Sequence, residues 1–214
     1  MTLPGLALQN CYGKLAWGLV FAALAYAMLP ASFQRSRMKV ALLAVAAMAV
    51  MLLPQQYSPA YWLALAFQWP SGLLAACCLL VLARPWLPAA QAEGSMPATF
   101  AAPLALLGAL LYLDTFGLIP LGLYYWGFSP MAAPMLALGV AAVCVAAIML
   151  GRARAQHVAV LGAIALFSVL RLPTGNLWDA LLDPLLWLWA VASLAYMGWR
   201  KVTNKNINKG VSQW

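Results

Sequence analysis

The sequence predicts an all-α, polytopic transmembrane bundle of about seven helices. Hydrophobic residues make up 66% of the 214 residues and charged residues only 7%, whereas a soluble domain carries about 25% charged residues. The apolar residues form solid blocks, such as 40–53 and 131–150, and do not alternate with polar residues as in a transmembrane β-strand. Basic residues gather between these blocks, as loop residues do in a membrane protein.

Each membrane-spanning helix needs about 20 apolar residues, fewer if flanking side chains reach the interface. We expect helices at 15–31, 39–53, 59–83, 98–123, 130–151, 156–172 and 183–199. Because the second helix is short, residues 39–83 could instead form a re-entrant hairpin and leave five spans. Both arrangements keep every later segment on the same side of the membrane.

We expect residues 1–201 to form a single transmembrane domain. Its three-helix part (15–83) precedes a proline-containing linker (84–97) and a four-helix part (98–199). The polar segment 202–214 holds few apolar residues, so it is predicted to be a disordered cytoplasmic tail.

The basic residues predict the orientation. Ten of the twelve fall in loops on one side of the seven spans, and only Lys14 and Arg171 fall on the other. The positive-inside rule therefore places the N-terminus outside and the C-terminus in the cytoplasm. Cleavage after Ala25-Tyr26-Ala27 would put the cluster 35–39 outside, so a retained first helix is favoured. Short loops and compact size indicate a bacterial inner (plasma) membrane.

The net charge of +8 is explained by these loop clusters, which indicate contact with the lipid bilayer and its anionic headgroups and not with nucleic acid. The four cysteines show no CxxC spacing, and His157 is the only histidine. We therefore expect no metal site, no disulfide framework and no cofactor.

Three helix starts on the outer side share one pattern. Ser58-Pro59, Ser129-Pro130 and Asp183-Pro184 each combine an N-cap residue with proline at the first helical position. Three helix N-termini facing outward, with Arg171 nearby, would favour a bound carboxylate or phosphate. The same pattern is also explained by ordinary helix capping.

Two charged residues lie near the outer ends of predicted helices. Arg171 follows the sixth helix, and Asp114 lies inside the fourth, where an unpaired carboxylate would be costly. We expect Asp114 and Arg171 to pair. The pair would be either a structural link or part of a solute or proton path.

The segment after Arg171 predicts a second helix start at Asn176, with Trp178 and Asp179 in its first turn. If that helix continues, Asp179 and Asp183 share one face and could bind a cation or share a proton; alternatively, both are N-caps. Separately, Gln68 lies beside Pro70 in the third helix and is predicted to line a pocket between the third and fourth helices.

Three classes of function remain open. The first is an accessory or binding subunit of a membrane assembly, related to envelope lipids or glycans, with a membrane-protein partner or a second copy of itself. The second is a small-solute or proton-coupled transporter that uses Asp114 and Arg171. The third is an enzyme acting on an outer-leaflet lipid-linked substrate, with Asp179 or Asp183 as base and Arg171 holding a phosphate. The sequence favours the first, because it carries no recognisable catalytic motif.

Overall fold

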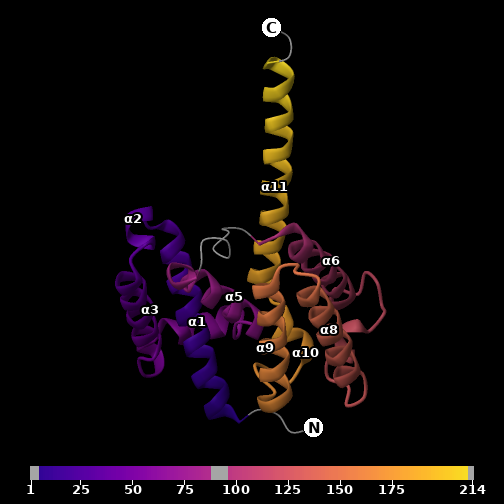
Figure 1. The fold of residues 1–214 in the computed structure, drawn as a ribbon. Coiled ribbons are helices and arrows are strands. Elements are labelled where there is room, and N and C mark those ends of the chain that lie inside the picture. Colours follow the sequence, from indigo (N-terminus) through magenta and orange to yellow (C-terminus); the bar gives the residue numbers. More distant parts are fainter. Residues whose placement is uncertain (1–4, 88–95, 212–214) are drawn as a thin grey trace.

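The computed structural model describes residues 5–87 and 96–211, with side chains through residue 204, and this part of the chain is all-helical (Figure 1). Its elements are α1 (Leu6–Met28), α2 (Ala31–Gln34), α3 (Arg37–Met51), η1 (Gln55–Tyr57), α4 (Pro59–Phe67), α5 (Gly72–Leu82), η2 (Arg84–Trp86), α6 (Ala98–Thr115), α7 (Leu123–Trp126), α8 (Ala132–Met149), α9 (Arg154–Leu170), α10 (Leu177–Leu181) and α11 (Pro184–Val211).

Three helices, α1, α6 and α8, are long and apolar enough to cross a membrane, and α5 and α9 are apolar but shorter. The prediction of an all-helical chain with apolar helices able to span a membrane is therefore confirmed for the described residues. The number of spans and their direction across the bilayer stay predictions.

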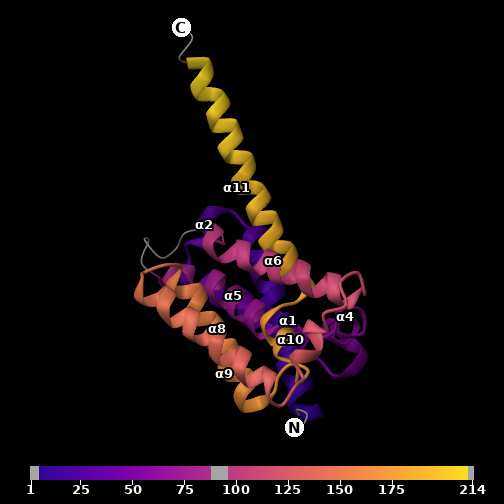
Figure 2. The same ribbon diagram turned by 90° about the vertical axis from the view of Figure 1, so that its right-hand side faces the viewer.

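The two predicted parts share one interior (Figures 1 and 2). In the N-terminal part α1 packs between α3 and α5, and α5 packs on α9, which in turn packs on α8. Small residues allow these close approaches: a Cβ on Gly72 of α5 would lie 3.3 Å from Ala163 of α9. On the other side of the molecule α6 packs on α11.

The predicted third helix, 59–83, is in fact two helices. α4 ends at Phe67 and α5 begins at Gly72, because Pro70 lacks an amide hydrogen and disfavours a helical residue before it. Side chains of α1 take up two carbonyls of the break. Trp17 Nε1 donates to the Gln68 oxygen at 3.1 Å, and Tyr12 Oη donates to the Pro70 oxygen at 2.8 Å.

Other boundaries also differ from prediction. α1 begins at Leu6 and not at residue 15, so the polar residues that precede Leu15 belong to a helix. α6 ends at Thr115 and not at residue 123, because Gly117 takes a left-handed conformation (φ 72°).

The C-terminal segment is helical as far as Val211. Residues 202–211, predicted to be disordered, continue α11; no proline or glycine interrupts the chain between Trp199 and Lys209. Residues 212–214 of the predicted tail and 88–95 of the predicted linker lie outside the described residues.

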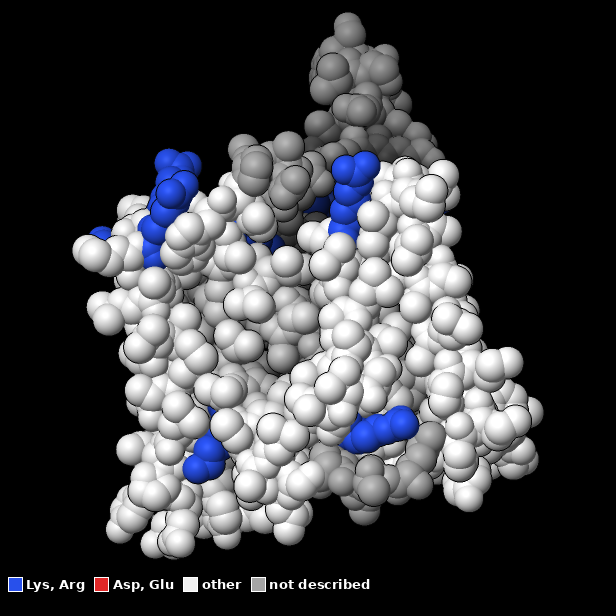
Figure 3. Space-filling view, turned by 60° about the horizontal axis from the view of Figure 1, so that its bottom comes forward, with Lys and Arg blue, Asp and Glu red and all other residues white. Residues whose placement is uncertain are grey.

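Basic side chains mark the two ends of the bundle. The α2 region and the α8–α9 connection lie at the same end in Figure 1, and Arg37 Nε donates to the Pro85 oxygen there. We call this the basic end; its charged residues are Arg35, Arg37, Lys39, Arg84, Arg152 and Arg154. The opposite end, with Lys14 and Arg171, is called the pocket end. Figure 3 shows blue side chains towards both ends, separated by a broad uncharged band.

Candidate functional site

A pocket with a volume of about 570 Å³ opens at the pocket end. It lies between α1, η1, α4 and the segment that follows α9. Its lining residues are Gln9, Asn10, Lys14, Gln55, Tyr61, Ala64, Leu65, Gln68, Trp69 and Thr174. The combination of side-chain amides with two aromatic rings suits a polar ligand that also has an apolar face.

The amides of this pocket differ in what they bind. Gln9 Nε2 donates to the Pro173 oxygen at 2.6 Å, which holds α1 against the segment after α9. By contrast, the side chains of Asn10, Gln55 and Gln68 make no hydrogen bond with any other described residue. Three amide groups of the lining therefore remain able to bind a ligand or water.

Two of these amides sit on an uncommon backbone. Gln55 and Gln68 have positive φ values, 43° and 63°, although neither is glycine. With ψ at −153°, Gln68 lies in a region that only glycine occupies readily. Strain of this kind gathers at ligand-binding sites, and both strained glutamines line the same pocket.

Lys14 is the basic residue of the pocket lining, and its side chain reaches towards the end of α3. Lys14 Nζ donates to the Leu53 oxygen at 2.9 Å, at the C-terminal end of α3. An ammonium group has three donors, and this carbonyl takes one of them. Lys14 therefore keeps capacity for a polar or negatively charged ligand group.

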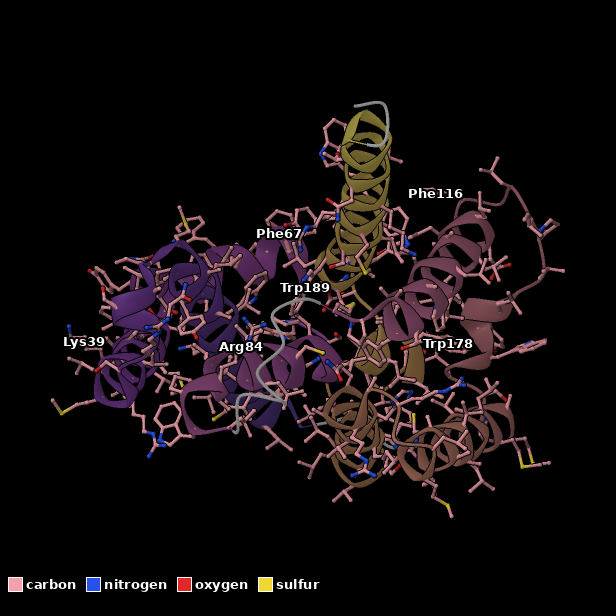
Figure 4. The ribbon with its side chains drawn as sticks, turned by 45° about the horizontal axis from the view of Figure 1, so that its top comes forward. Lys39, Phe67, Arg84, Phe116, Trp178 and Trp189 are labelled. Carbon is pink, nitrogen blue, oxygen red and sulfur yellow. The ribbon has the colours of Figure 1, made fainter. Side chains whose placement is uncertain are left out.

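Residues 171–183, which we call the strap, run from the end of α9 into the interior. Asn176 is fully buried; its Oδ1 accepts from the Trp178 amide (2.9 Å) and its Nδ2 donates to the Tyr124 oxygen (3.4 Å). Trp178 Nε1 donates to the Leu123 oxygen at 2.9 Å. Figure 4 shows Trp178 inside the molecule and Lys39 at its outer edge. The strap is thus locked to α7.

Asp179 lies directly behind the pocket wall. Its carboxylate accepts hydrogen bonds from the hydroxyls of Thr174 and Tyr124, and Thr174 also lines the pocket. Burial raises the pKa of Asp179 above its usual range, and these two hydrogen bonds act against that rise. Burial and the nearby Asp179 carboxylate raise the pKa of Tyr124 to about 12.

One carboxylate, that of Asp183, caps two helices. Its Oδ2 accepts from the Ser71 amide at 2.7 Å, next to the start of α5, and its Oδ1 accepts from the Leu186 amide at 2.8 Å, in the first turn of α11. Ser71 is fully buried, and its own hydroxyl accepts from Leu74. The predicted capping role of Asp183 is confirmed, and it also joins the strap to the break between α4 and α5.

Asp114 does not pair with Arg171. Its carboxylate accepts from the backbone amides of Leu121, Gly122 and Tyr124 at 2.7–3.0 Å, so it closes the loop between α6 and α7. The Arg171 guanidinium instead lies over the Phe167 ring, 5.0 Å from its centroid. The predicted ion pair is therefore wrong, because nearby backbone donors satisfy the carboxylate.

Of the two alternatives for Asp179 and Asp183, the one in which both lie on one face of a continued helix is not found. α10 ends at Leu181, and Leu182 is extended, so the two carboxylates do not share a helical face. Asp179 binds hydroxyl groups, whereas Asp183 binds backbone amides. Among the residues with described side chains, no group of three histidine, cysteine or acidic residues is close enough to hold a metal ion.

The structure therefore separates the predicted site residues into two groups. Gln68 lines the pocket, although its neighbour across the pocket is α1 and not the fourth helix. Asn176, Trp178, Asp179 and Asp183 form the strap, and Asp114 fixes the α6–α7 loop beside it. The sequence did not identify Asn10, Gln55, Tyr61 or Thr174. Asn10 could have been found from its position between Gln9 and Lys14, had the first helix been extended to Leu6.

The chain was compared with protein families, curated proteins and solved structures. No protein-family model, curated protein or solved structure matches this chain.

Proposed function

We propose that this protein is an integral membrane binding subunit that holds a polar, glycan-like ligand in the pocket at its outer face. The orientation follows from charge: with the basic end in the cytoplasm, the positive-inside rule is obeyed and the pocket faces outward. The membrane is proposed to be the bacterial inner membrane. The ligand class is a sugar or a sugar-containing headgroup of the outer leaflet.

One observation carries this proposal: the unengaged amides of Asn10, Gln55 and Gln68 surround the same pocket as the rings of Tyr61 and Trp69. Sugars offer hydroxyl groups that both donate and accept hydrogen bonds, as side-chain amides do. Aromatic rings can cover the apolar face of a sugar ring. The single cation, Lys14, adds affinity for an acidic sugar or a phosphate.

Binding is favoured over catalysis because the acidic groups near the pocket are already engaged. Asp114 and Asp183 accept five backbone hydrogen bonds between them, and Asp179 accepts two from hydroxyl groups. A general base needs a free acceptor within reach of its substrate. Hydrogen bonding within the protein leaves these carboxylates better suited to hold the fold than to take a substrate proton.

The test is ligand binding by the full chain in lipid nanodiscs, with an array of neutral and acidic oligosaccharides as the probe. We expect wild type to bind a subset, and Gln68→Ala and Asn10→Ala each to weaken binding about three- to tenfold, the effect of one lost hydrogen bond. Gln56→Ala is the matched control, because Gln56 is exposed and lies outside the lining. Binding by no oligosaccharide, or equal weakening by Gln56→Ala, would overturn the proposal.

The subunit part of the proposal needs its own experiment. We expect purification in mild detergent, followed by mass spectrometry, to recover a membrane-protein partner in stoichiometric amount. Arg171→Ala is a useful comparison, since the Arg171 guanidinium packs on the Phe167 ring and its side chain makes no hydrogen bond or ion pair with a described residue. A protein that elutes alone or as a homo-oligomer, with its oligosaccharide binding intact, would keep the pocket and discard the partner.

Transport is a second candidate, and one observation favours it. The break between α4 and α5 meets the start of α11 at Asp183, so two interrupted stretches of chain lie together inside the bundle. Many transporters bind their substrates at such discontinuous helices. A proton leak into proteoliposomes that wild type supports and Asp183→Asn abolishes would favour this candidate over a binding subunit.

A further inference from the structure

A second cavity, separate from the pocket, runs along the side of the C-terminal part. It has a volume of about 660 Å³ and lies between α6, α8 and α9. Its walls include Phe100 and Leu107 of α6, Gly139 and Val143 of α8, and Val160 of α9. Because α6 packs on α11 while α8 packs on α9, the space between α6 and α8 is left open. We call it the lateral groove.

With α6 and α8 as membrane spans, the lateral groove would lie at the depth of the hydrocarbon core. Two of its walls, α6 and α8, are among the three helices able to span a membrane. On α8 the lining runs from Ala132 to Cys144, a length of about 18 Å at 1.5 Å per residue. That is more than half of the roughly 30 Å hydrocarbon core. An apolar groove of this length within the bilayer matches an acyl chain.

One end of the lateral groove is marked by polar and basic residues. Thr99 and His157 line it there, and the His157 ring packs edge-on against Phe100 with centroids 5.7 Å apart. Just before His157 the chain carries Arg152 and Arg154, both exposed and without an ion pair to any described residue. Two arginines at the mouth of an apolar groove complement a lipid phosphate.

We propose that the lateral groove binds one anionic phospholipid, with an acyl chain between α6 and α8 and its phosphate beside Arg152 and Arg154. The lipid would belong to the leaflet at the basic end. This inference does not depend on the pocket, because the two cavities share no lining residue. It assigns the groove a specific lipid in place of general bilayer contact.

The experiment is native mass spectrometry of the full chain in detergent, titrated with phosphatidylglycerol or with phosphatidylcholine of the same acyl chains. Gly139→Leu adds a side chain to the wall of the groove, and a Cβ at this position meets no atom within 4 Å. Gly162→Leu is the matched control: it too meets no atom within 4 Å, and it lies outside the lining. For the headgroup, the double variant Arg152→Gln/Arg154→Gln is compared with Arg35→Gln, an exposed arginine elsewhere at the basic end.

We expect wild type to retain one phosphatidylglycerol at voltages that remove phosphatidylcholine. Gly139→Leu displaces several methylene groups and should weaken retention at least about tenfold, and the double arginine variant should remove the preference for phosphatidylglycerol. Gly162→Leu and Arg35→Gln should match wild type. Unchanged retention by Gly139→Leu would overturn the groove as the site. Equal retention of the two lipids by wild type would overturn the role given to the arginines.

Discussion

The strap and the pocket lie at the same end of the molecule and share Thr174, yet their polar side chains differ in whether they have hydrogen-bond partners. In the strap, Asn176, Asp179 and Asp183 all have hydrogen-bond partners within the protein. In the pocket, the amides of Asn10, Gln55 and Gln68 have none among described residues. Polar residues of the strap therefore hold the fold together, and those of the pocket are available to a ligand.

The difference has an energetic reason. A partly buried carboxylate without partners costs more free energy than an exposed amide without partners, because the charge loses part of its hydration. Free backbone amides at the helix starts and in the α6–α7 loop donate hydrogen bonds to the carboxylates of Asp114 and Asp183. Each of the three amides faces a cavity that water can enter, so it can stay unpaired at little cost.

Removal of the double cap at Asp183 should have the largest effect. Asp183→Ala leaves the Ser71 and Leu186 amides without an acceptor and detaches the strap from α5. A hydrogen bond to a charged group contributes about 1.5–3 kcal/mol. We expect the variant to lose about 3 kcal/mol or more of unfolding free energy, measured by denaturant titration in detergent micelles.

Asp183→Asn is the control for this prediction. Its amide oxygen can accept one of the two hydrogen bonds, so we expect about half the loss. An unfolding free energy of Asp183→Ala within about 0.5 kcal/mol of the wild-type value would mean that apolar packing holds the strap. The contrast between the strap and the pocket would then disappear.

A substitution in the pocket should have the opposite effect on stability: the unfolding free energy should rise while the affinity for the ligand falls. Gln68→Gly relieves a backbone that only glycine adopts readily, and such strain costs about 1–3 kcal/mol. We expect the variant to be more stable than wild type by an amount at the lower end of that range, in the same denaturant titration. Its affinity for oligosaccharide should fall as in Gln68→Ala, because both lack the amide.

Gln56→Gly is the control that separates relief of backbone strain from the general effect of introducing a glycine. Gln56 does not have a positive φ, so glycine there adds only conformational freedom to the unfolded chain and should destabilise by about 0.5 kcal/mol. A loss of stability in both variants would show that Gln68 is not strained, and its position at the pocket would then be incidental.

The sequence predicted the strap better than the pocket, and the reason is local. Asn176 and Asp183 precede apolar helical runs, and the N-cap signal that identified them depends on neighbours within three residues. The pocket depends on separate chain segments: Asn10 lies in α1, Gln55 in η1, and Gln68 directly after α4. No local signal joins such residues.

Two features of the fold were hidden for a physical reason. α1 was predicted to start at residue 15, since Gln9, Asn10 and Lys14 interrupt the apolar pattern; that start removed three pocket residues from the first helix. The sequence predicts one helix through Pro70, over 59–83, whereas the structure has a true interruption there, because Tyr12, Trp17 and Asp183 satisfy its backbone groups. Those partners lie up to 112 residues away.

The smallest expected effect concerns Asp179, the residue that touches both regions. Because burial raises its pKa in the folded protein, the folded state holds the proton more tightly than the unfolded state does. Asp179 therefore favours folding most at or below about pH 4, and this contribution is lost as pH rises through the folded-state pKa.

Asp179→Asn cannot titrate, so its unfolding free energy should change less with pH in that window. Tyr124→Phe removes one donor that lowers this pKa and should extend the loss to higher pH. Denaturant titrations of the three proteins between pH 4 and pH 8 compare these slopes. Parallel profiles for wild type and Asp179→Asn would mean that Asp179 is solvated through the pocket, and it would then belong with the ligand-binding residues and not with the strap.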